Sequence, residues 1–215
     1  MSQPADMPAD PIDRPQDPLE YERAFWGRGL LVAGVDEVGR GPLAGPVVAA
    51  AVILPAGCVI EGATDSKKLN ASRREALAEE ILARATAVRM GAASVREIDL
   101  ANILVSTGWA MGRALSGLRT KPDQVVVDGL PMKSLRWKHE AVVGGDGSIH
   151  CVSCASIVAK VCRDRLMKKL AVRYPGYGWE RNAGYGTEEH RDALNRLGAT
   201  PHHRVSFGGV QYGLF

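Results

Sequence analysis

The chain has 215 residues, 46% of them hydrophobic, which is enough for one domain with a substantial core. It has neither the basic start and apolar stretch of a signal peptide nor a segment apolar for long enough to cross a membrane, so we expect a cytoplasmic protein rather than a secreted or membrane-spanning one. The formal net charge is +3; the first 20 residues, with five acids and one arginine, contribute −4, which leaves +7 for the rest. This excess is compatible with an anionic polymer as partner, or simply with a charged, well-solvated surface.

The N-terminal segment has the composition of a disordered tail. Its first 20 residues contain five prolines and four aspartates and show almost no apolar periodicity. Such a segment cannot bury enough apolar surface to offset the entropy that is lost on ordering. We therefore predict a disordered tail over residues 1–24 and a folded domain over residues 25–215.

The next segment, residues 31–48, is an apolar strand that runs into two neighbouring carboxylates, Asp36 and Glu37. Because side chains alternate between the two faces of a strand, adjacent acids serve one centre only where the strand ends or bulges. Gly39 and Gly41, on either side of Arg40, indicate such an end and let another molecule approach the backbone closely. An Asp-Glu pair by itself is more often a solvated turn, so the later acids decide between these interpretations.

Two later β-branched or apolar runs also end in acids, one at Asp128-Gly129 and one at Gly144-Gly145-Asp146. If three strands end in acids at one edge of a sheet, four carboxylates meet, and without cations their repulsion would raise some of their pKa values. Hard divalent cations such as Mg²⁺ prefer oxygen ligands of this kind, and a pair of them can assist hydrolysis of a phosphodiester. We therefore predict a metal site held by Asp36, Glu37, Asp128 and Asp146.

The other periodic segments alternate between strand and helix. The apolar run over residues 46–54 predicts a second strand that forms a hairpin with the first and is covered on both faces. The alternation after residue 124 favours parallel pairing. The remaining predicted elements are a strand over 87–94, helices over 71–85, 153–173 and 188–197, and one long helix over 98–118. Together they predict an α/β fold, a five-stranded mixed sheet flanked by helices, with the acids beyond the strands' carboxyl ends.

The four cysteines do not form a convincing metal or disulfide pattern. Cys151 and Cys154 have a spacing found in zinc sites, but Cys58 and Cys162 supply no matching pair. A cytoplasmic context disfavours disulfides. We interpret Cys162 as a small buried hydrophobe on the apolar side of the helix over 153–173.

Two features near the C-terminus have more than one interpretation. On the amphipathic helix over 153–173, Lys160 and Asp164 are spaced to pair, and the simplest role for Lys160 and Arg163 is surface ion pairing. The glycine-rich aromatic segment 174–187 either stacks on a sugar or base, or pins its loop to the core. The residues alone leave both alternatives open.

Several motifs stand in one order along the chain: Asp36-Glu-Val-Gly-Arg-Gly-Pro-Leu-Ala-Gly-Pro-Val47, Asp65-Ser-Lys-Lys-Leu69, Asp128-Gly129, Gly145-Asp146, Ala155-Ser-Ile-Val-Ala-Lys-Val161, Arg163-Asp164, Gly184-Tyr-Gly-Thr187 and His202-His-Arg204. An ordered set is far more specific than any one motif. Over about residues 30–210 this set resembles the bacterial ribonuclease HII family. The resemblance implies a ribonuclease H-like catalytic domain over 25–215 with a C-terminal helical segment.

The same resemblance implies an endonuclease that hydrolyses the RNA strand of RNA/DNA hybrids and nicks 5′ to single ribonucleotides in duplex DNA. It implies two Mg²⁺ or Mn²⁺ ions on the four acids, in-line attack by water, and 3′-hydroxyl and 5′-phosphate products. The expected cellular roles are removal of ribonucleotides from DNA and of RNA primers, by a monomer.

For substrate recognition, the resemblance places Gly39, Arg40 and Gly41 on the ribose 2′-hydroxyl and the adjacent phosphate. It places Tyr185 against the sugar at the RNA-to-DNA junction and Lys67 near a backbone phosphate. This agrees with the chemistry, because only the 2′-hydroxyl distinguishes the two nucleic acids at one position. The resemblance also implies, as the alternative to surface ion pairing, that Lys160 and Arg163 help to hold the acidic centre.

The chain departs from the family pattern at several positions. Gly144 and Asn182-Ala183 replace common basic residues, Val205 replaces an arginine, and Leu130 replaces a polar residue. None is an expected metal ligand, so we expect weaker binding of substrate rather than lost activity.

The last five residues, from Gln211 to Phe215, resemble the short peptide by which bacterial DNA enzymes dock on the sliding clamp. The alternative is that Leu214 and Phe215 pack on their own domain.

Two rival functions remain: an all-DNA strand-transfer or junction-resolving nuclease, and a non-catalytic hybrid-binding module. The Gly-Arg-Gly and Gly-Tyr motifs argue against the first, and the intact acids argue against the second.

Overall fold

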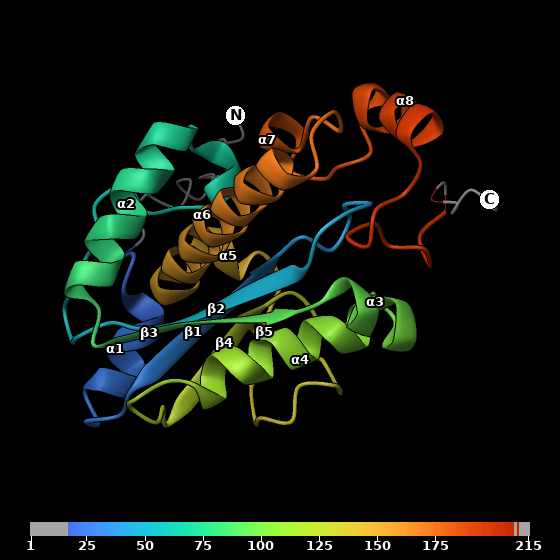
Figure 1. Ribbon diagram of the computed structural model, residues 1–215. Helices are drawn as coiled ribbons and strands as arrows, with labels where there is room; N and C mark the ends of the chain where they lie inside the picture. Colours follow the sequence, from blue (N-terminus) through green and yellow to red (C-terminus); the bar gives the residue numbers. More distant parts are fainter. Residues whose placement is uncertain (1–16, 209, 211–215) are drawn as a thin grey trace, which may run out of the picture.

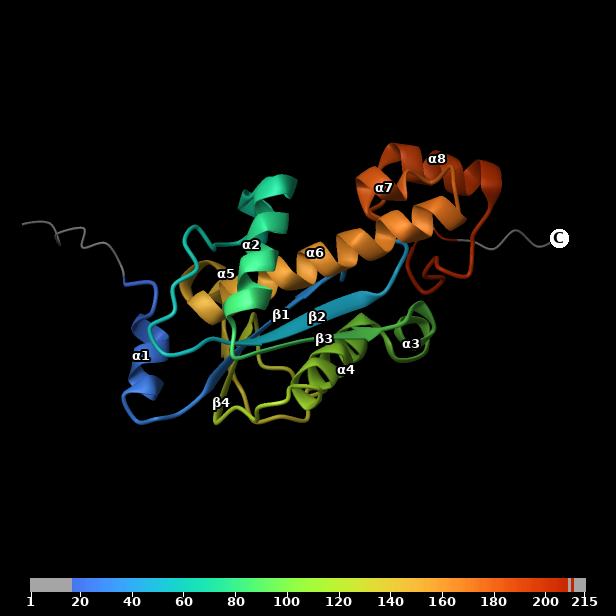
Figure 2. The same cartoon turned by 60° about the vertical axis from the view of Figure 1, so that its left-hand side comes forward.

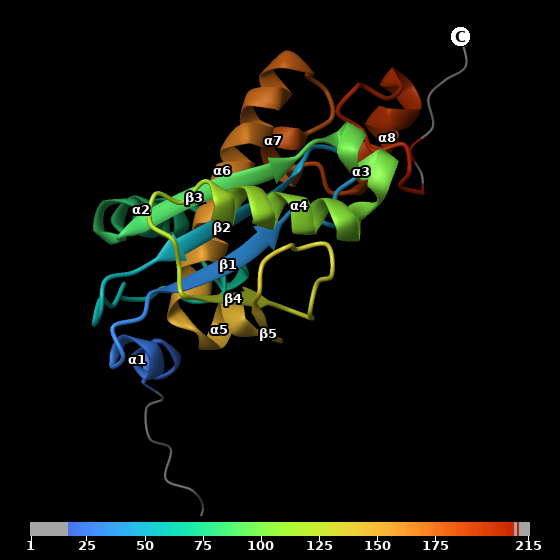
Figure 3. The same ribbon diagram turned by 90° about the horizontal axis from the view of Figure 1, so that it is seen from below.

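A computed structural model describes residues 17–208 and residue 210. Its centre is a five-stranded sheet in the order β3-β2-β1-β4-β5 (Figure 3). β1 pairs antiparallel with β2 and β2 with β3, whereas β1 with β4 and β4 with β5 are parallel. The strands are β1 Val32–Val38, β2 Val47–Ile53, β3 Ala87–Ala93, β4 Gln124–Asp128 and β5 Glu140–Val142. The predicted mixed sheet and its hairpin are confirmed.

Helices cover both faces of this sheet (Figure 1). α2 and α6 lie on one face, and α3 and α4 on the other. Every residue of β2 is buried, which is the reason why this strand has a continuous apolar sequence and no polar alternation. The helix bounds are α2 Ala71–Arg84, α3 Val95–Ala101, α4 Ile103–Ser116 and α6 His150–Arg173.

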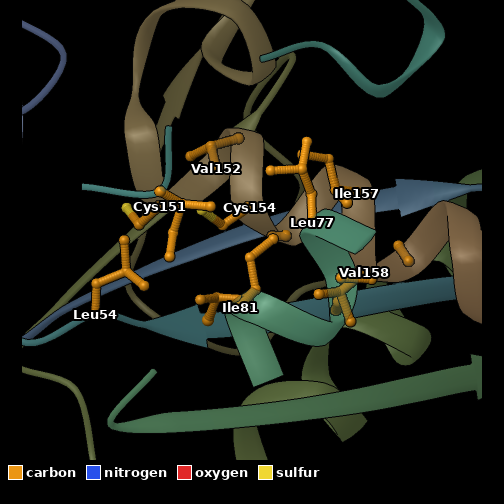
Figure 4. Packing of buried hydrophobic residues seen from close by; sticks show 14 of the residues in the cluster. Leu54, Leu77, Ile81, Cys151, Val152, Cys154, Ile157 and Val158 are labelled. Carbon is orange, nitrogen blue, oxygen red and sulfur yellow. The ribbon is translucent and has the colours of Figure 1, made fainter. Parts of the chain in front are cut away.

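The core between α2 and α6 is packed from aliphatic side chains and two cysteines (Figure 4). Leu77 and Ile81 of α2 belong to the same buried cluster as Ile157 of α6. Cys151 and Cys154 are fully buried free thiols, and burial raises the pKa of both. They therefore act as small hydrophobes. Cys162, for which we predicted the same role, is only half-buried.

The amphipathic pattern predicted for α6 applies only to its second half. The helix begins at His150 rather than Ser153, and every residue from His150 to Ala159 is buried. The reason is that this half packs on β1 and β2 on one side and on α2 on another, so no face of it meets solvent.

The single helix predicted over 98–118 is wrong, because the chain breaks at Asn102. Asn102 has a φ of 74°, in the left-handed region, and ends α3. Its side-chain Oδ1 then accepts a hydrogen bond from the Val105 N–H at 3.1 Å and caps α4. With ψ at 166° this is a backbone conformation found mainly in glycine, and the hydrogen bond from the Asn102 side chain to α4 helps to offset its strain.

The predicted tail extends too far. Residues 1–16 lie outside the described part of the chain, but Glu20–Trp26 form a helix, α1, that packs beside β1 (Figure 2). Glu22 is fully buried, and its Oε1 accepts a hydrogen bond from the Cys151 N–H, in the first turn of α6, at 2.7 Å. Apolar periodicity missed this helix because it is only two turns long.

The C-terminal segment packs against the far end of α6, as Figure 2 shows. α7 (Trp179–Asn182) and α8 (Glu188–Leu197) form a separate small core with Leu43, Met167 and Tyr177. Among the described residues, the helices are all too short or too polar to span a bilayer.

Candidate active site

Asp36 and Glu37 lie inside β1 and not at its end. β1 continues to Val38 and pairs with β2 in an unbroken register past both acids, so the predicted strand end or bulge is wrong. The other neighbour of β1 is shorter: its last residue is Asp128, one step after the pairing opposite Val35. β1 therefore extends beyond the end of β4, and Asp36 and Glu37 lie near enough to Asp128 for its charge to act on both.

Asp146 also occupies a different element from the predicted one. β5 ends at Val142, and Asp146 lies on α5 (Gly145–Ser148), a single turn that follows Gly144 at φ 74°. A methyl group on Gly145 would lie 3.7 Å from Asp128 Oδ1, so this turn lies close to the end of β4. A helical turn, and not a third strand end, brings Asp146 to the other acids.

The four acids form one electrostatic group, which we call the acidic cluster. Burial, with the nearby charges of Glu37 and Asp128, raises the pKa of Asp36 well above its usual range. Burial likewise raises the pKa of Glu37, and burial together with Asp128 raises that of Asp146. Desolvation and mutual repulsion thus disfavour the charged forms, as the sequence predicted for carboxylates that meet without cations.

Two basic side chains stand beside the acidic cluster. Lys67 Nζ lies 3.3 Å from Asp146 Oδ2, and Arg40 Nη1 lies 3.2 Å from Glu37 Oε1. Lys67 is held on a short 3₁₀ turn, η1 (Ser66–Lys68), which Asp65 caps. Both basic side chains are largely exposed, at 77% and 48%, so these ion pairs are weak and open to exchange with a phosphate.

The donor set of the acidic cluster fits hard divalent cations. Glu37 Oε2 and Asp128 Oδ1 are buried carboxylate oxygens without a hydrogen-bond partner among the described residues. A buried carboxylate oxygen without a donor is costly unless a cation satisfies it, and oxygen-only ligands suit Mg²⁺ and Mn²⁺. Within the described ranges, no three acidic, histidine or cysteine side chains already stand in a metal-binding arrangement.

A hollow of about 240 Å³ is lined both by predicted substrate-binding residues and by two of the four acids. Asp36, Glu37, Lys67 and Tyr185 all line it. The Tyr185 ring is 42% exposed, and a methyl group on Gly41 would lie 3.9 Å from its Cε1 atom. The structure thus brings the acids, Lys67, Tyr185 and the Gly-Arg-Gly segment to one end of the sheet.

The positions that depart from the family pattern have local structural roles. The Asn182 side chain donates to the Tyr177 carbonyl and accepts from the Gly184 N–H, both at 2.8 Å, and so shapes the loop that carries Tyr185. Gly144, with its positive φ, starts α5. Leu130 is 73% exposed in a second hollow of about 500 Å³ on the Asp128 and Arg40 side.

Sequence reasoning misjudged Arg163 and missed Arg204. Arg163, interpreted as a surface ion-pairing residue, is fully buried, and so is Arg204. The sequence did contain a signal, because Arg163 has no acid three or four positions away in either direction. The predicted pair is confirmed, with Lys160 Nζ 2.8 Å from Asp164 Oδ1. Ser156, whose hydroxyl donates to Ser66 at 2.9 Å beside Asp36, was also missed.

The sheet order, the two helical layers and the acidic cluster define a nuclease of the ribonuclease H-like fold class. Ribonuclease H2 from Pyrococcus horikoshii superposes with a TM-score of 0.72 and 27% identity, covering 84% of this chain and 95% of that one. The ribonuclease HII in the PCNA:RNase HII complex from Archaeoglobus fulgidus gives the same TM-score and identity, with 86% and 98% coverage.

The sequence comparisons are more specific. The profile of the family Ribonuclease HII matches residues 33–210. Ribonuclease HII of Paracoccus denitrificans is 58% identical over 191 residues, which is 88% of this chain and 90% of the relative. The chain belongs to the ribonuclease HII family. It is therefore a metal-dependent ribonuclease H, an endonuclease that acts on RNA/DNA hybrids.

Proposed function

We propose that this enzyme nicks duplex DNA on the 5′ side of a single embedded ribonucleotide, besides cutting the RNA strand of hybrids. The observation that carries the proposal is the hollow lined by Asp36, Glu37 and Tyr185 together, with Gly41 beside the tyrosine ring. A glycine backbone and one aromatic ring recognise a sugar without reading a base. Cleavage then depends on the ribose and is independent of sequence.

Within this site, two divalent ions, Mg²⁺ or Mn²⁺, would be held by Asp36, Glu37, Asp128 and Asp146. The unpaired oxygens of Glu37 and Asp128 support this assignment. When bound, such ions lower the pKa of a water molecule and stabilise charge on a leaving oxygen. Water then attacks in line, and the products carry a 3′-hydroxyl and a 5′-phosphate.

The remaining assignments concern recognition of the substrate. Gly39 and Gly41 would offer backbone groups to the ribose 2′-hydroxyl, and Arg40 would contact the adjacent phosphate. Tyr185 would pack on the sugar, and Lys67 would leave Asp146 to bind a phosphate. The exposure of Arg40, Lys67 and Tyr185 supports these roles.

The test uses a labelled DNA duplex with one ribonucleotide, an all-DNA duplex as control, and the Asp128→Asn variant. We expect metal-dependent nicking 5′ to the ribonucleotide, abolished by the substitution and by chelator. Cleavage of the all-DNA control by the wild type would instead favour a DNA nuclease and contradict ribose recognition. Binding without cleavage would favour a non-catalytic hybrid-binding module.

We also propose that residues 211–215, which lie outside the described part of the chain, dock on a sliding clamp. An archaeal relative has been solved in a PCNA:RNase HII complex, and this supports the idea. Deleting residues 211–215 and measuring clamp binding by surface plasmon resonance tests it, since unchanged binding would end the proposal. The expected setting of this activity is removal of ribonucleotides from DNA and of RNA primers, by a cytoplasmic monomer.

A further inference from the structure

The backbone segment proposed to contact the ribose is rich in glycine. The recognition loop, which we define as residues 39–46, contains Gly39 at φ 95° and Gly45 at φ 85°. Glycine loses more conformational freedom on ordering than any other residue. A loop of this kind orients hydrogen-bonding groups toward a ligand only if something else holds it in place.

Arg204 holds the loop from within the protein. Its Nη2 donates to the carbonyls of Gly39 and Gly45 at 2.6 and 2.7 Å, its Nη1 to that of Arg40 at 3.0 Å, and its Nε to that of Gly45 at 2.9 Å. The side chain is fully buried. One guanidinium thus joins the two ends of the loop.

Arg163 completes this support from α6. Its Nε donates to the Pro46 carbonyl at 3.0 Å and its Nη2 to the Ala44 carbonyl at 3.0 Å. Among the described residues, neither Arg163 nor Arg204 has a carboxylate partner, and their hydrogen bonds go to backbone carbonyls. Burial, together with the neighbouring Arg163, lowers the pKa of Arg204 to about 9, which is the electrostatic cost of this arrangement.

These hydrogen bonds orient the peptide groups at the start of the recognition loop. The carbonyls of Gly39 and Arg40 point inward to Arg204. The N–H groups of Gly39, Arg40 and Gly41 donate to no other group in the described part of the chain. The loop therefore keeps its donors free for a hydroxyl or phosphate oxygen of the substrate.

The same support extends to the loop that carries Tyr185, residues 183–187. The N–H groups of Leu43 and Ala44 both donate to the Gly184 carbonyl, at 2.8 and 3.3 Å, and Arg163 Nη1 donates to the Ala183 carbonyl at 2.8 Å. A methyl group on Gly184 would lie 2.6 Å from the Ala44 carbonyl oxygen, so the two loops touch through their backbones.

A buried histidine pair fixes the Tyr185 backbone. His203 Nδ1 accepts from the Thr200 N–H at 2.8 Å, so the proton of neutral His203 is on Nε2 and faces His190 Nε2 at 3.0 Å. His190 Nε2 also accepts from Trp179 Nε1 at 3.0 Å, so the His190 proton is on Nδ1 and is donated to the Tyr185 carbonyl at 2.9 Å. Each tautomer is determined by a group that only donates.

We propose that Arg163, Arg204 and the His190–His203 pair are positioning residues for ribose recognition, which hold the recognition loop and the Tyr185 loop in one fixed relative orientation. All four side chains are buried, so they act through the two loops and touch no substrate. The proposal rests on the proposed function, because it names the groups that prepare that site for the sugar.

The first test compares Arg204→Lys with wild type on the one-ribonucleotide duplex. A lysine keeps the charge but reaches only part of the Gly39, Arg40 and Gly45 carbonyls. We expect KM to rise about tenfold while kcat changes less than about threefold, because ground-state recognition is lost and the acids are untouched. Arg113→Lys is the matched control, since Arg113 donates to the Ala92 carbonyl away from both loops and should leave KM unchanged.

The second test uses two substitutions at one position. Asparagine at position 190 retains a donor near the place of Nδ1 and can still bond the Tyr185 carbonyl, whereas glutamine loses that bond. We expect His190→Asn, which keeps the bond to the Tyr185 carbonyl but loses the contacts to His203 and Trp179, to raise KM less than His190→Gln, which should resemble Arg204→Lys. The buried His150, which accepts from the Ile60 N–H far from both loops, supplies the control variant His150→Gln.

Hydrogen exchange of the free protein, followed by mass spectrometry, separates this proposal from the proposed function. We expect exchange of the hydrogen-bonded amides of the recognition loop, those of Leu43, Ala44 and Gly45, to accelerate by about tenfold or more in Arg204→Lys. Wild-type protein that fails to nick the ribonucleotide duplex would refute the proposed function. Active wild type together with unchanged KM and unchanged exchange in Arg204→Lys would refute the positioning role. A fall in kcat alone would also refute it.

Discussion

Ionisation of the Asp36 carboxyl group would lower the stability of the metal-free protein, because its pKa is raised. Burial and the neighbouring acids raise its pKa, so at neutral pH the folded state disfavours the ionised form that a metal ion needs. Stability given up at a functional site is a recurrent feature of enzymes.

We therefore expect Asp36→Asn to raise the free energy of unfolding of the metal-free protein at pH 7 by about 1–2 kcal/mol, measured by urea denaturation. Added Mg²⁺ should stabilise the wild type more than the variant, because one ligand is missing. The exposed Asp192 supplies the control, and Asp192→Asn should change little. A metal-free Asp36→Asn protein that is less stable than wild type would contradict this account.

His203 makes the stability of the protein depend on pH, because its pKa differs between the folded and the unfolded chain. Burial and the neighbouring His190 lower its pKa to about 4. In the unfolded chain it takes up a proton near pH 6.5, but in the folded protein only near pH 4. The stability it contributes is therefore complete above about pH 6.5 and is lost as the pH falls toward 4.

We expect the wild type to lose up to about 3 kcal/mol of unfolding free energy more than His203→Asn between pH 7 and pH 4, measured by urea denaturation across this range. The other charged or titratable groups that act on the pair, Glu189 and His202, are present in both proteins and cancel in the comparison. Equal pH slopes for the two proteins would show that His203 is not held neutral.

At the scale of elements, the apolar pattern of the sequence predicted β2 correctly but failed at the break between α3 and α4. A short apolar run that contains β-branched residues favours a strand covered on both faces, and β2 is such a strand. The run through Asn102 is periodic enough for one helix, but local capping by Asn102 divides it into two. A short side chain that competes for backbone hydrogen bonds can outweigh periodicity.

Asn102→Ala removes the cap of α4 and keeps a side chain at a position of positive φ. We expect a loss of about 1–2 kcal/mol in unfolding free energy, measured by chemical denaturation. Asn102→Gly loses the cap but accepts the φ of 74°, so it should cost less. Equal losses in the two variants would mean that the backbone conformation contributes nothing.

At the scale of the whole molecule, the folded unit begins before the point that composition suggested. α1 closes one end of the sheet, where Leu19 is almost fully buried and Glu22 meets the start of α6. The segments with α7 and α8 close the other end and carry the Tyr185 loop. Segments near both ends of the described chain thus complete the folded unit.

We expect a protein that begins at residue 27 to be several kcal/mol less stable than one that begins at residue 17, because it loses the buried side chains of α1 and the Glu22 bond to the Cys151 N–H. Thermal denaturation of the two truncated proteins measures the difference. Equal melting temperatures would show that α1 lies on the domain without stabilising it.

The sequence by itself determined the sheet and the hairpin, and it indicated the four acids proposed for the site. Asp36, Glu37 and Asp128 could be found because strand patterns are local and because acids next to glycines interrupt them. The prediction that each acid lies at the end of a strand was wrong for Asp36, Glu37 and Asp146. Where a strand ends depends on its neighbour in the sheet, which the local sequence does not contain.

Only the tertiary structure decided how the site is held. Arg163 and Arg204 are charged, and residue type alone places them at the surface, with the missing ion-pair partner of Arg163 as the single local hint against it. They are buried because distant segments turn backbone carbonyls toward them, and no local pattern records a contact between residues as far apart as Gly39 and Arg204. Chemistry that resides in side-chain identity can be found in the sequence, whereas positioning that resides in long-range hydrogen bonds appears only after the chain has folded.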